Sequence, residues 1–335
     1  MTERSPLRCE VIAEAGVNHN GDVRMAHHLV DVVADAGADC IKFQTFVTAL
    51  LTTPDAPLAT YQEHAAASTQ RGLLDQLVLP DEAWPELVEH AADRQIDFLS
   101  TAFDIPSLER LLDLGISRLK IPSGELTNLP FVRQVASYNR PLLISTGMAT
   151  LEEVGAALQA AAAAPAVTVL HCVSLYPAPL EVANLSAMTT IGDTFDVPVG
   201  WSDHTVGEIS ALGAVALGAT VLEKHVTLDN SLTGPDHRAS ADPTAFHAYV
   251  AAVRALQSAL GDGTKRPAPA ELEMRRVARR SWYTTRALPA GHVLCENDLV
   301  ALRPVSGIEP DVDPTGRELR RALPVGGALR EDDLV

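Results

Sequence analysis

Residues 25–45, MAHHLVDVVADAGADCIKFQT, contain one complete unit of the pattern that decides the fold. Apolar residues recur at helical spacing in the first part of this stretch, and Gly37 marks the end of that segment. A short apolar run over 39–45 then has the length and composition of a buried strand. A helix that ends at a glycine directly before a strand is a unit of a parallel α/β sheet.

The same unit recurs along the chain from residue 9 to about residue 260. Eight strands are expected, most of them separated by helical patterns, and eight such units are the number in a (β/α)₈ TIM barrel rather than a doubly wound sheet. The insertion over 46–80 is then an elaborated loop on the active face. The expected strands are 9–15, 39–45, 96–103, 118–123, 141–146, 167–176, 197–203 and 220–226.

The composition of the chain changes after Leu260. We predict a barrel domain over 1–260 and a linker over 261–280, because the latter is rich in Gly and Pro and then basic. A small β-rich module follows over 281–335, since short apolar runs alternate there with turn residues. This module is too short to be a second enzyme, and we expect no internal repeat.

Composition limits the partners and the compartment. The 335 residues include 26 Lys and Arg and 43 Asp and Glu, for a net charge of −17, which argues against binding to nucleic acid or to an anionic membrane. Four scattered cysteines without a CxxC pair suit a reducing cytoplasm. The uncharged stretch 154–180 is split by Pro165, so it favours a buried helix and strand over a membrane span, and the N-terminus lacks a signal-peptide pattern.

Polar and charged side chains stand at nearly every expected strand end, which is costly unless a ligand or water satisfies them. The lysines sharpen this pattern, because the chain has four lysines against 22 arginines. On the two-residue alternation of a strand, the side chains of Lys42 and Lys120 point into the barrel. The side chain of Lys224 points to the opposite face of its strand and is expected to be structural. Two inward ammonium groups with hydroxyls beside them predict a dianion site. The flanking hydroxyl residues are Thr101, Ser123, Ser145 and Ser202.

His204 and His225 follow neighbouring strands. Both imidazoles could bind one divalent cation with positions left open for substrate, which would suit Mn²⁺ or Mg²⁺ better than a closed zinc site. From the residues alone, the alternative stays open that the two histidines only form hydrogen bonds and bind no metal. The spacing of 21 residues forms no contiguous metal motif.

Nine motifs, in order, resemble the sialic acid synthase family, whose members condense phosphoenolpyruvate with an N-acylmannosamine-type sugar. The C-terminal module resembles the antifreeze-like (SAF) domain of the same family, through RRSWYTTRALPAG and LRPVSGIEP. The resemblance covers essentially the whole chain. The barrel motifs are AEAGVNHNGD, ADCIKFQTF, STAFD, KIPSGELTNLP, STGMATLEE, LHCVSLYPAP, GWSDHTVG, EKHVTLD and GPDHRAS.

The resemblance implies a role for each matching residue. His204 and His225 would bind Mn²⁺ or Mg²⁺, Glu14 would be the acid or base, and Glu223 is the second candidate. The family forms a dimer in which the SAF domain of one chain caps the barrel of the other, and Arg303 would reach the acyl group of the sugar. The residues implied to surround phosphoenolpyruvate are Lys42, Thr101, Lys120, Ser123, Ser145, Ser174 and Ser202, and those facing the sugar are Gln44, Tyr176 and Asp236.

The resemblance leaves the acceptor sugar open. It favours an N-acetylneuraminate synthase, with a legionaminic or pseudaminic acid synthase acting on a 2,4-diacetamido-trideoxy hexose as the alternative. Ala102, Trp201 and Leu175 depart from the usual motifs and are expected near the sugar. A synthase of 3-deoxy-octulosonate or heptulosonate phosphates is a further enzyme hypothesis, although it has no use for the SAF module. The non-enzyme hypothesis is an inactive sugar-binding barrel.

Overall fold

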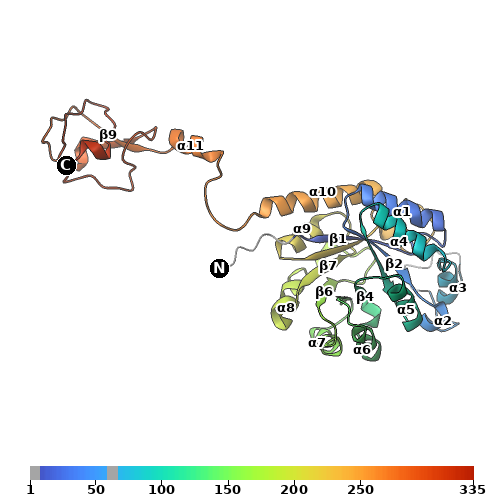
Figure 1. The fold of residues 1–335 in the computed structure, drawn as a ribbon. Helices are drawn as coiled ribbons and strands as arrows, with labels where there is room; N and C mark the ends of the chain where they lie inside the picture. The colour runs from blue at the N-terminus through green and yellow to red at the C-terminus, as the bar shows by residue number, and fades with distance from the viewer. Residues whose placement is uncertain (1–7, 59–66) are drawn as a thin grey trace. The chain divides into compact units, whose positions relative to one another are not determined.

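The computed structural model describes residues 8–58 and 67–335. The chain divides between Asp262 and Gly263 into two compact units, which we call the barrel unit and the second unit (Figure 1). Each unit is described by itself below.

The barrel unit is a closed barrel of eight parallel strands in sequential order, and β1 pairs with β8 to close it. The predicted (β/α)₈ TIM barrel is therefore confirmed (Figure 1). The strands are β1 (Glu10–Gly16), β2 (Cys40–Thr45), β3 (Asp97–Ala102), β4 (Leu119–Ile121), β5 (Leu142–Ser145), β6 (Val167–Cys172), β7 (Val199–Asp203) and β8 (Val221–His225).

Helices surround the barrel, and several of them begin at a residue whose side chain caps them. Asp22 accepts backbone hydrogen bonds at the start of α1, and Thr150 and Glu153 form a reciprocal capping box at the start of α7. Within the described residues, no helix is long and apolar enough to cross a membrane. The helices are α1 (Val23–Asp35), α2 (Thr48–Leu51), α3 (Gln70–Asp75), α4 (Ala83–Asp93), α5 (Ile105–Asp113), α6 (Leu129–Ser137), α7 (Leu151–Ala160), α8 (Ser186–Phe195), α9 (Ile209–Ala216) and α10 (Pro243–Leu260).

Alternation along the strands separates an apolar outer layer from a polar inner mouth. Outward side chains pack against the helices, and this layer includes Trp201, which is 0% exposed beside His171. Ala102 is likewise buried in the apolar core. The expectation that these two departures lie near the sugar is therefore wrong, because their positions on the strands direct them away from the barrel interior.

The second unit contains a short helix, α11 (Glu271–Ala278), inside the stretch expected to be a linker. An antiparallel pair of strands follows, formed by β9 (Ser281–Thr284) and β10 (Leu299–Leu302). Its core is a cluster of buried aliphatic residues that includes Leu288 and Leu329. The relationship of this unit to SAF domains stays a prediction.

The expectation of no internal repeat is wrong. Residues 286–300 (RALPAGHVLCENDLV) and 321–335 (RALPVGGALREDDLV) are identical at 10 of 15 aligned positions. Leu288 and Leu323 occupy equivalent positions and exchange backbone hydrogen bonds of 2.9 Å in both directions. This reciprocal pair is what a twofold relationship between the copies requires.

Each copy of the repeat holds one buried aspartate in the same way. Arg286 donates to Asp298 Oδ1 at 2.7 Å, and Arg321 donates to Asp333 Oδ1 in the second copy. Both carboxylates also accept a backbone N–H from the residue three positions earlier. The two copies therefore share the buried ion pair and the turn that fixes it.

The barrel interior predicts a stability effect at Gly200 of β7. A Cβ there would lie 2.4 Å from the carbonyl oxygen of Val221 and 2.6 Å from Leu170 Cδ2. We expect Gly200→Ala to lower the free energy of unfolding by about 1–3 kcal/mol, because overpacking forces the backbone to shift. Gly124→Ala is the control, since a Cβ at Gly124 meets nothing within 4 Å. Equal urea midpoints for the two variants would contradict this description of the barrel interior.

Candidate active site

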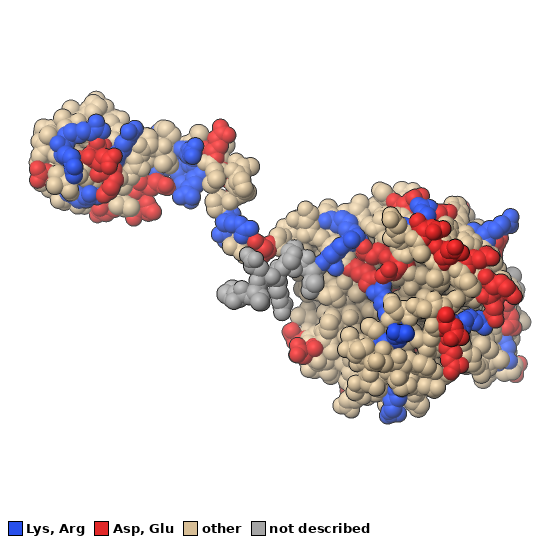
Figure 2. All heavy atoms as spheres, in the orientation of Figure 1, with Lys and Arg blue, Asp and Glu red and all other residues tan. Residues whose placement is uncertain are grey.

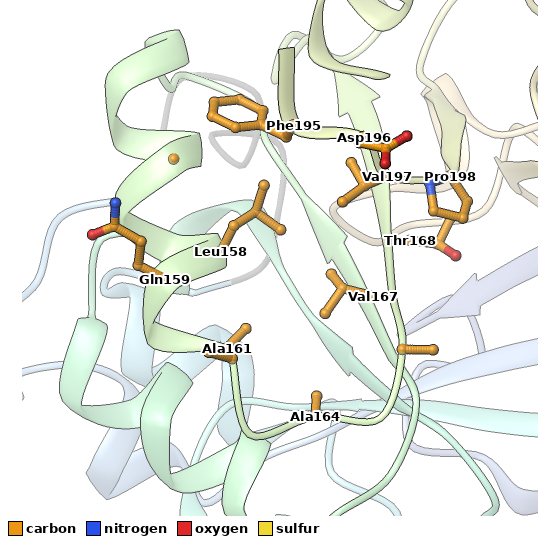
Figure 3. A pocket seen from close by; sticks show the side chains of 13 residues that line it. Leu158, Gln159, Ala161, Ala164, Val167, Thr168, Phe195, Asp196, Val197 and Pro198 are labelled. Carbon is orange, nitrogen blue, oxygen red and sulfur yellow. The ribbon is translucent and has the colours of Figure 1, made fainter. Parts of the chain in front are cut away.

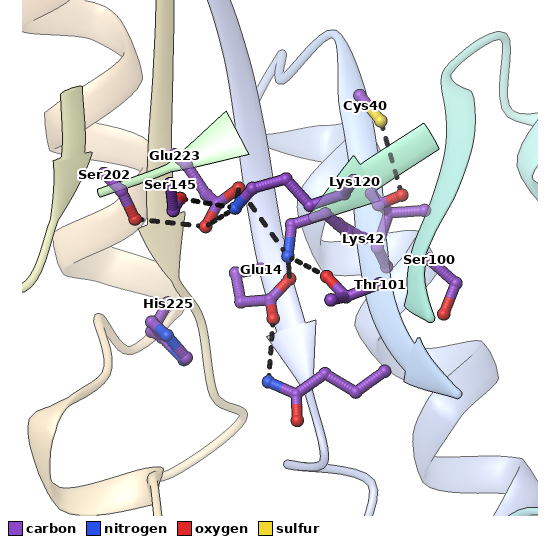
Figure 4. Close-up of polar contacts among 12 residues, drawn as sticks. Glu14, Cys40, Lys42, Ser100, Thr101, Lys120, Ser145, Ser202, Glu223 and His225 are labelled. Carbon is purple, nitrogen blue, oxygen red and sulfur yellow. Dashed lines mark hydrogen bonds and ion pairs between the residues drawn. The ribbon is translucent and has the colours of Figure 1, made fainter. Parts of the chain in front are cut away.

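The predicted site residues of the barrel gather at the carboxyl ends of the strands (Figure 4). The two-residue period of a strand places alternate side chains inside, so parity decides which residues meet. Side chains from β1, β2, β3, β4, β5, β7 and β8 converge there, as the close-up shows. They are Glu14, Lys42, Thr101, Lys120, Ser145, Ser202, Glu223 and His225.

The two inward lysines are each held by a carboxylate and a hydroxyl. Lys42 Nζ lies 2.6 Å from Glu14 Oε2 and donates to Thr101 Oγ1 at 2.9 Å. It also lies 3.6 Å from Glu223 Oε2, so both carboxylates face this ammonium group.

Lys120 forms the other half of the arrangement. Its Nζ donates to Ser145 Oγ at 2.7 Å and to Glu223 Oε2 at 3.1 Å (Figure 4). Ser202 Oγ donates to Glu223 Oε1 at 3.1 Å. Glu223 is therefore the common partner of both lysines.

This quartet differs from the dianion site expected from the lysines alone. Glu14, Lys42, Lys120 and Glu223 are all at most 4% exposed, and two positive charges face two negative charges. Buried ions require such pairing because isolated charges cannot be desolvated cheaply. Without substrate, the lysines are neutralised by the protein itself.

The two carboxylates have opposite titration behaviour. Burial raises the pKa of Glu14 to about 7, although Lys42 opposes the shift. For Glu223, burial is outweighed by Lys120 and Lys42, which hold the pKa of this carboxyl well below its usual range. Glu223 is thus a fixed anion, whereas Glu14 can exchange a proton near neutral pH.

A second group of polar residues adjoins Glu14. Gln44 Nε2 donates to Glu14 Oε1 at 3.1 Å. Asp236, in the loop after β8, lies with its Oδ2 4.0 Å from His225 Nδ1, and burial raises the pKa of its carboxyl to about 6. Gly16 fits between these groups with a φ of +54°, a conformation suited to glycine.

The two histidines lie side by side, with ring centroids 5.4 Å apart, and the ring of Tyr176 lies 4.1 Å from that of His204. His204 Nδ1 donates to the carbonyl oxygen of Val173 at 2.7 Å, which leaves the lone pair on Nε2. His225 Nδ1 is buried without a hydrogen-bond partner. Burial lowers the pKa of both imidazoles, so both are neutral.

These donors fit a divalent cation, because neutral imidazoles with free lone pairs are metal ligands. Over residues 8–58 and 67–335, no group of three or more His, Cys, Asp or Glu side chains has an arrangement that could hold a metal ion. Any cation at the pair would therefore keep most of its coordination positions open to substrate or water.

Three predicted residues lie outside the strands that were expected to carry them. β4 ends at Ile121, so Ser123 lies in the short 3₁₀ turn that follows. β6 ends at Cys172, so Ser174 and Tyr176 belong to the loop that follows. Ser174 nevertheless approaches Ser123, because both pack around Gly147: Gly147 N donates to Ser123 Oγ at 2.9 Å, and a Cβ on Gly147 would lie 2.1 Å from Ser174 Oγ.

Sequence reasoning missed Gly147. The available signal was its parity with Ser145, which places it two residues further along the same inward face. Arg303 follows β10 in the second unit, where it is exposed, and its role stays a prediction.

A separate groove lies at the other end of the barrel wall (Figure 3). It has a volume of about 540 Å³ and is lined by apolar residues such as Leu158, Phe195 and Val197, together with the first residues of β6. Because it lies at the amino ends of the strands and lacks the charged groups described above, it is not the candidate active site.

Comparison with known proteins gives consistent results. A family model described as the NeuB family matches residues 29–265. The N,N'-diacetyllegionaminic acid synthases of Legionella pneumophila and Campylobacter jejuni are 44% and 42% identical, covering 91% and 89% of this chain and 88% and 91% of their own. The structure of an N-acetylneuraminic acid (sialic acid) synthetase from Leptospira borgpetersenii has a TM-score of 0.69 and 32% identity, covering 79% of this chain and 90% of that one. The chain therefore belongs to the NeuB family, and the resemblance to sialic acid synthases is confirmed.

Proposed function

We propose that this protein is a nonulosonic acid synthase that condenses phosphoenolpyruvate with a 2,4-diacetamido-trideoxy hexose and releases phosphate. The observation that carries the proposal is the buried quartet of two lysines and two glutamates in a barrel of this family. Lys42 and Lys120 are the cations that a phosphorylated, carboxylated substrate needs. A purely structural set of ion pairs would not need the three hydroxyl groups that contact this quartet, those of Thr101, Ser145 and Ser202.

These contacts support phosphoenolpyruvate as a substrate. Its phosphate and carboxylate would take the lysine donors now held by carboxylates, with hydroxyls completing the contacts. The donors would fix the enol carbon against the sugar aldehyde, so the chain contributes orientation. The hydroxyl residues in question are Thr101, Ser123, Ser145, Ser174 and Ser202.

The proposed reaction forms one carbon–carbon bond and one carbon–oxygen bond, the latter from water, and breaks the carbon–oxygen bond to phosphate. Of the two protons of the water, one ends on the former aldehyde oxygen and the other on the departing phosphate. The enol carbon attacks the aldehyde carbon, positive charge develops at the second carbon of phosphoenolpyruvate, water adds there, and phosphate leaves with the enol oxygen. Glu14 accepts the proton of the added water, since its pKa of about 7 is near the operating pH. Glu223 stays ionised and stabilises the developing positive charge.

His204 and His225 would hold a divalent cation, Mn²⁺ or Mg²⁺. When bound, the cation would act as a Lewis acid on the aldehyde oxygen. Asp236, Tyr176 and Gln44 lie around this position and would orient the sugar.

The acceptor assignment rests on the relatives and on one side chain. The two legionaminic acid synthases are 44% and 42% identical to this chain, compared with 32% for the N-acetylneuraminic acid synthetase, so the relatives favour a 2,4-diacetamido acceptor over N-acetylmannosamine. Leu175 is 49% exposed between Ser174 and Tyr176. An apolar side chain suits an acceptor in which an acetamido group replaces one ring hydroxyl and a methyl group replaces the hydroxymethyl group.

We also propose a dimer in which the second unit of one chain caps the barrel of the other, with Arg303 reaching the acyl group. Residues 1–262 carry 14 basic and 32 acidic side chains, whereas residues 263–335 carry 12 and 11. Acidic side chains gather over the barrel unit in Figure 2. Exposed Met148 and Val206, on loops at the carboxyl ends of the strands, offer apolar contact area for such a cap.

The first test is turnover with a panel of acceptors. Phosphate release from phosphoenolpyruvate with Mn²⁺ would be measured for N-acetylmannosamine, its 6-phosphate and the 2,4-diacetamido-trideoxy hexoses, with product masses by mass spectrometry. We expect a 2,4-diacetamido sugar to exceed N-acetylmannosamine by about 10-fold or more in kcat/KM. A preference for N-acetylmannosamine would overturn the acceptor assignment, and a protein that binds no phosphoenolpyruvate would overturn the enzyme proposal.

Glu14→Gln tests the proton acceptor. We expect kcat to fall about 10²–10⁴-fold with little change in the KM for phosphoenolpyruvate. In the native protein kcat should rise as the pH passes through about 7, because the Glu14 carboxylate forms there, and the variant should lack this rise. Glu223→Gln should also lower kcat, because the charge that stabilises the positive centre is lost, and it should lower stability, since Lys120 loses its buried partner. It should still show a rise of kcat with pH, because Glu14 is intact. A pH profile unchanged in Glu14→Gln would remove this assignment.

His225→Ala tests the cation site. We expect Mn²⁺ affinity to fall by more than about 100-fold. Loss of a residue that merely hydrogen-bonds to a metal ligand costs about 10–100-fold in affinity, and loss of a direct ligand should cost more. His28→Ala, on the exposed side of α1, is the matched control. Mn²⁺ binding would be followed by electron paramagnetic resonance and compared with turnover after chelation. Equal affinities in the two variants would contradict the site.

A further inference from the structure

A second buried ion pair lies on the other side of the barrel wall from the active site. Asp203 of β7 and Lys224 of β8 are register partners, with Lys224 Nζ 3.4 Å from Asp203 Oδ2. They are 1% and 3% exposed. Neither takes part in the proposed reaction, because both point outward between the strands and the helices. The sequence predicts a structural role for Lys224, and its position agrees with that expectation.

Stability alone does not explain this pair. The register partners before it on the same outward face are Trp201 and Leu222, which are apolar and fully buried. The same environment therefore accepts an apolar pair. Replacing a buried ion pair by packed apolar residues is often neutral or stabilising, because desolvation of the charges is avoided.

The contacts of the pair converge on one residue, Thr205. Asp203 Oδ1 accepts hydrogen bonds from Thr205 N at 2.9 Å and from Thr205 Oγ1 at 2.8 Å. Lys224 Nζ donates to the carbonyl oxygen of Thr205. The backbone N–H and carbonyl of Thr205, the residue directly after His204, are thus held by side chains of two strands.

The surroundings keep water out of these contacts. Tyr249 of α10 covers Lys224, with the ring centroid 5.4 Å from Nζ. Ser210 Oγ lies 2.6 Å from Thr205 Oγ1, and these three residues are at most 2% exposed. A low local dielectric strengthens the pair and fixes its geometry.

We infer that the Asp203–Lys224 pair positions the two histidines of the candidate cation site. His204 lies between Asp203 and Thr205, whose backbone the pair holds, and His225 is the neighbour of Lys224 on β8. The alternation of the strands places the pair outside and the imidazoles inside, so each half of the pair fixes one ligand. The inference rests on the cation site proposed above.

The double variant Asp203→Leu/Lys224→Met tests this role in the full chain. It replaces the pair by apolar residues of similar size, so thermal stability should stay close to that of the native protein. Mn²⁺ affinity, measured by electron paramagnetic resonance, should fall about 10–100-fold, as on loss of other outer partners of metal ligands. Asp203→Asn keeps the shape of the side chain and an oxygen that can accept from Thr205, so it should give a smaller loss of Mn²⁺ affinity, although thermal stability should fall because Lys224 loses its buried partner.

A matched control is the pair Glu10–Arg118 at the opposite end of the barrel, with Arg118 Nη1 2.6 Å from Glu10 Oε2. Glu10→Gln/Arg118→Met should leave Mn²⁺ affinity unchanged. Equal Mn²⁺ affinity in the Asp203/Lys224 variants and the native protein would overturn the positioning role. So would a loss of affinity that occurs in the variants of both ion pairs and follows their loss of thermal stability. A native protein that binds no Mn²⁺ would overturn the cation site and the positioning role together.

Discussion

The structure of the active end depends on the mutual neutralisation of four buried ions. Lys42, Lys120, Glu14 and Glu223 come from four different strands, and none of them could remain charged at this depth without the others. Closure of the barrel is therefore tied to the chemistry of its mouth. An error in the register of one strand would turn its charged residue outward and leave a buried ion without its partner.

The sequence predicts the barrel and its inward residues because both follow from local patterns. Strand length, the glycine at the end of the helical pattern and the two-residue alternation are readable in one stretch such as 25–45. Parity alone places Lys42 and Lys120 correctly on the inner face. The alternation along a strand does not predict which charged residues pair across the barrel. Glu223 and Lys120, for example, are 103 residues apart in the sequence.

Other features escape prediction for physical reasons that differ. The loop position of Ser174 depends on where β6 loses its partners, which is a tertiary property. The place of Trp201 in a motif suggests the sugar site, whereas its parity with Asp203 directs it into the outer core. The repeat in the second unit, by contrast, is readable in the sequence at 10 of 15 positions, and the structure adds that its two copies hold equivalent buried aspartates.

The charge balance of the mouth also constrains how an anionic substrate can enter. The quartet carries two positive and two negative charges, so it offers phosphoenolpyruvate no net attraction while the lysines stay paired. Binding must therefore be accompanied by a compensating cation or by a change at one carboxylate.

The structure provides a place for each of these two kinds of compensation. Neutral imidazoles lie where a divalent cation would add two charges, and Glu14, unlike Glu223, has a pKa of about 7 and can become neutral at little cost. Of the two, only the cation leaves Glu14 ionised to accept a proton, so the proposed chemistry favours the cation as the compensating charge. An acidic protein can then carry an anion-binding site without an exposed basic patch.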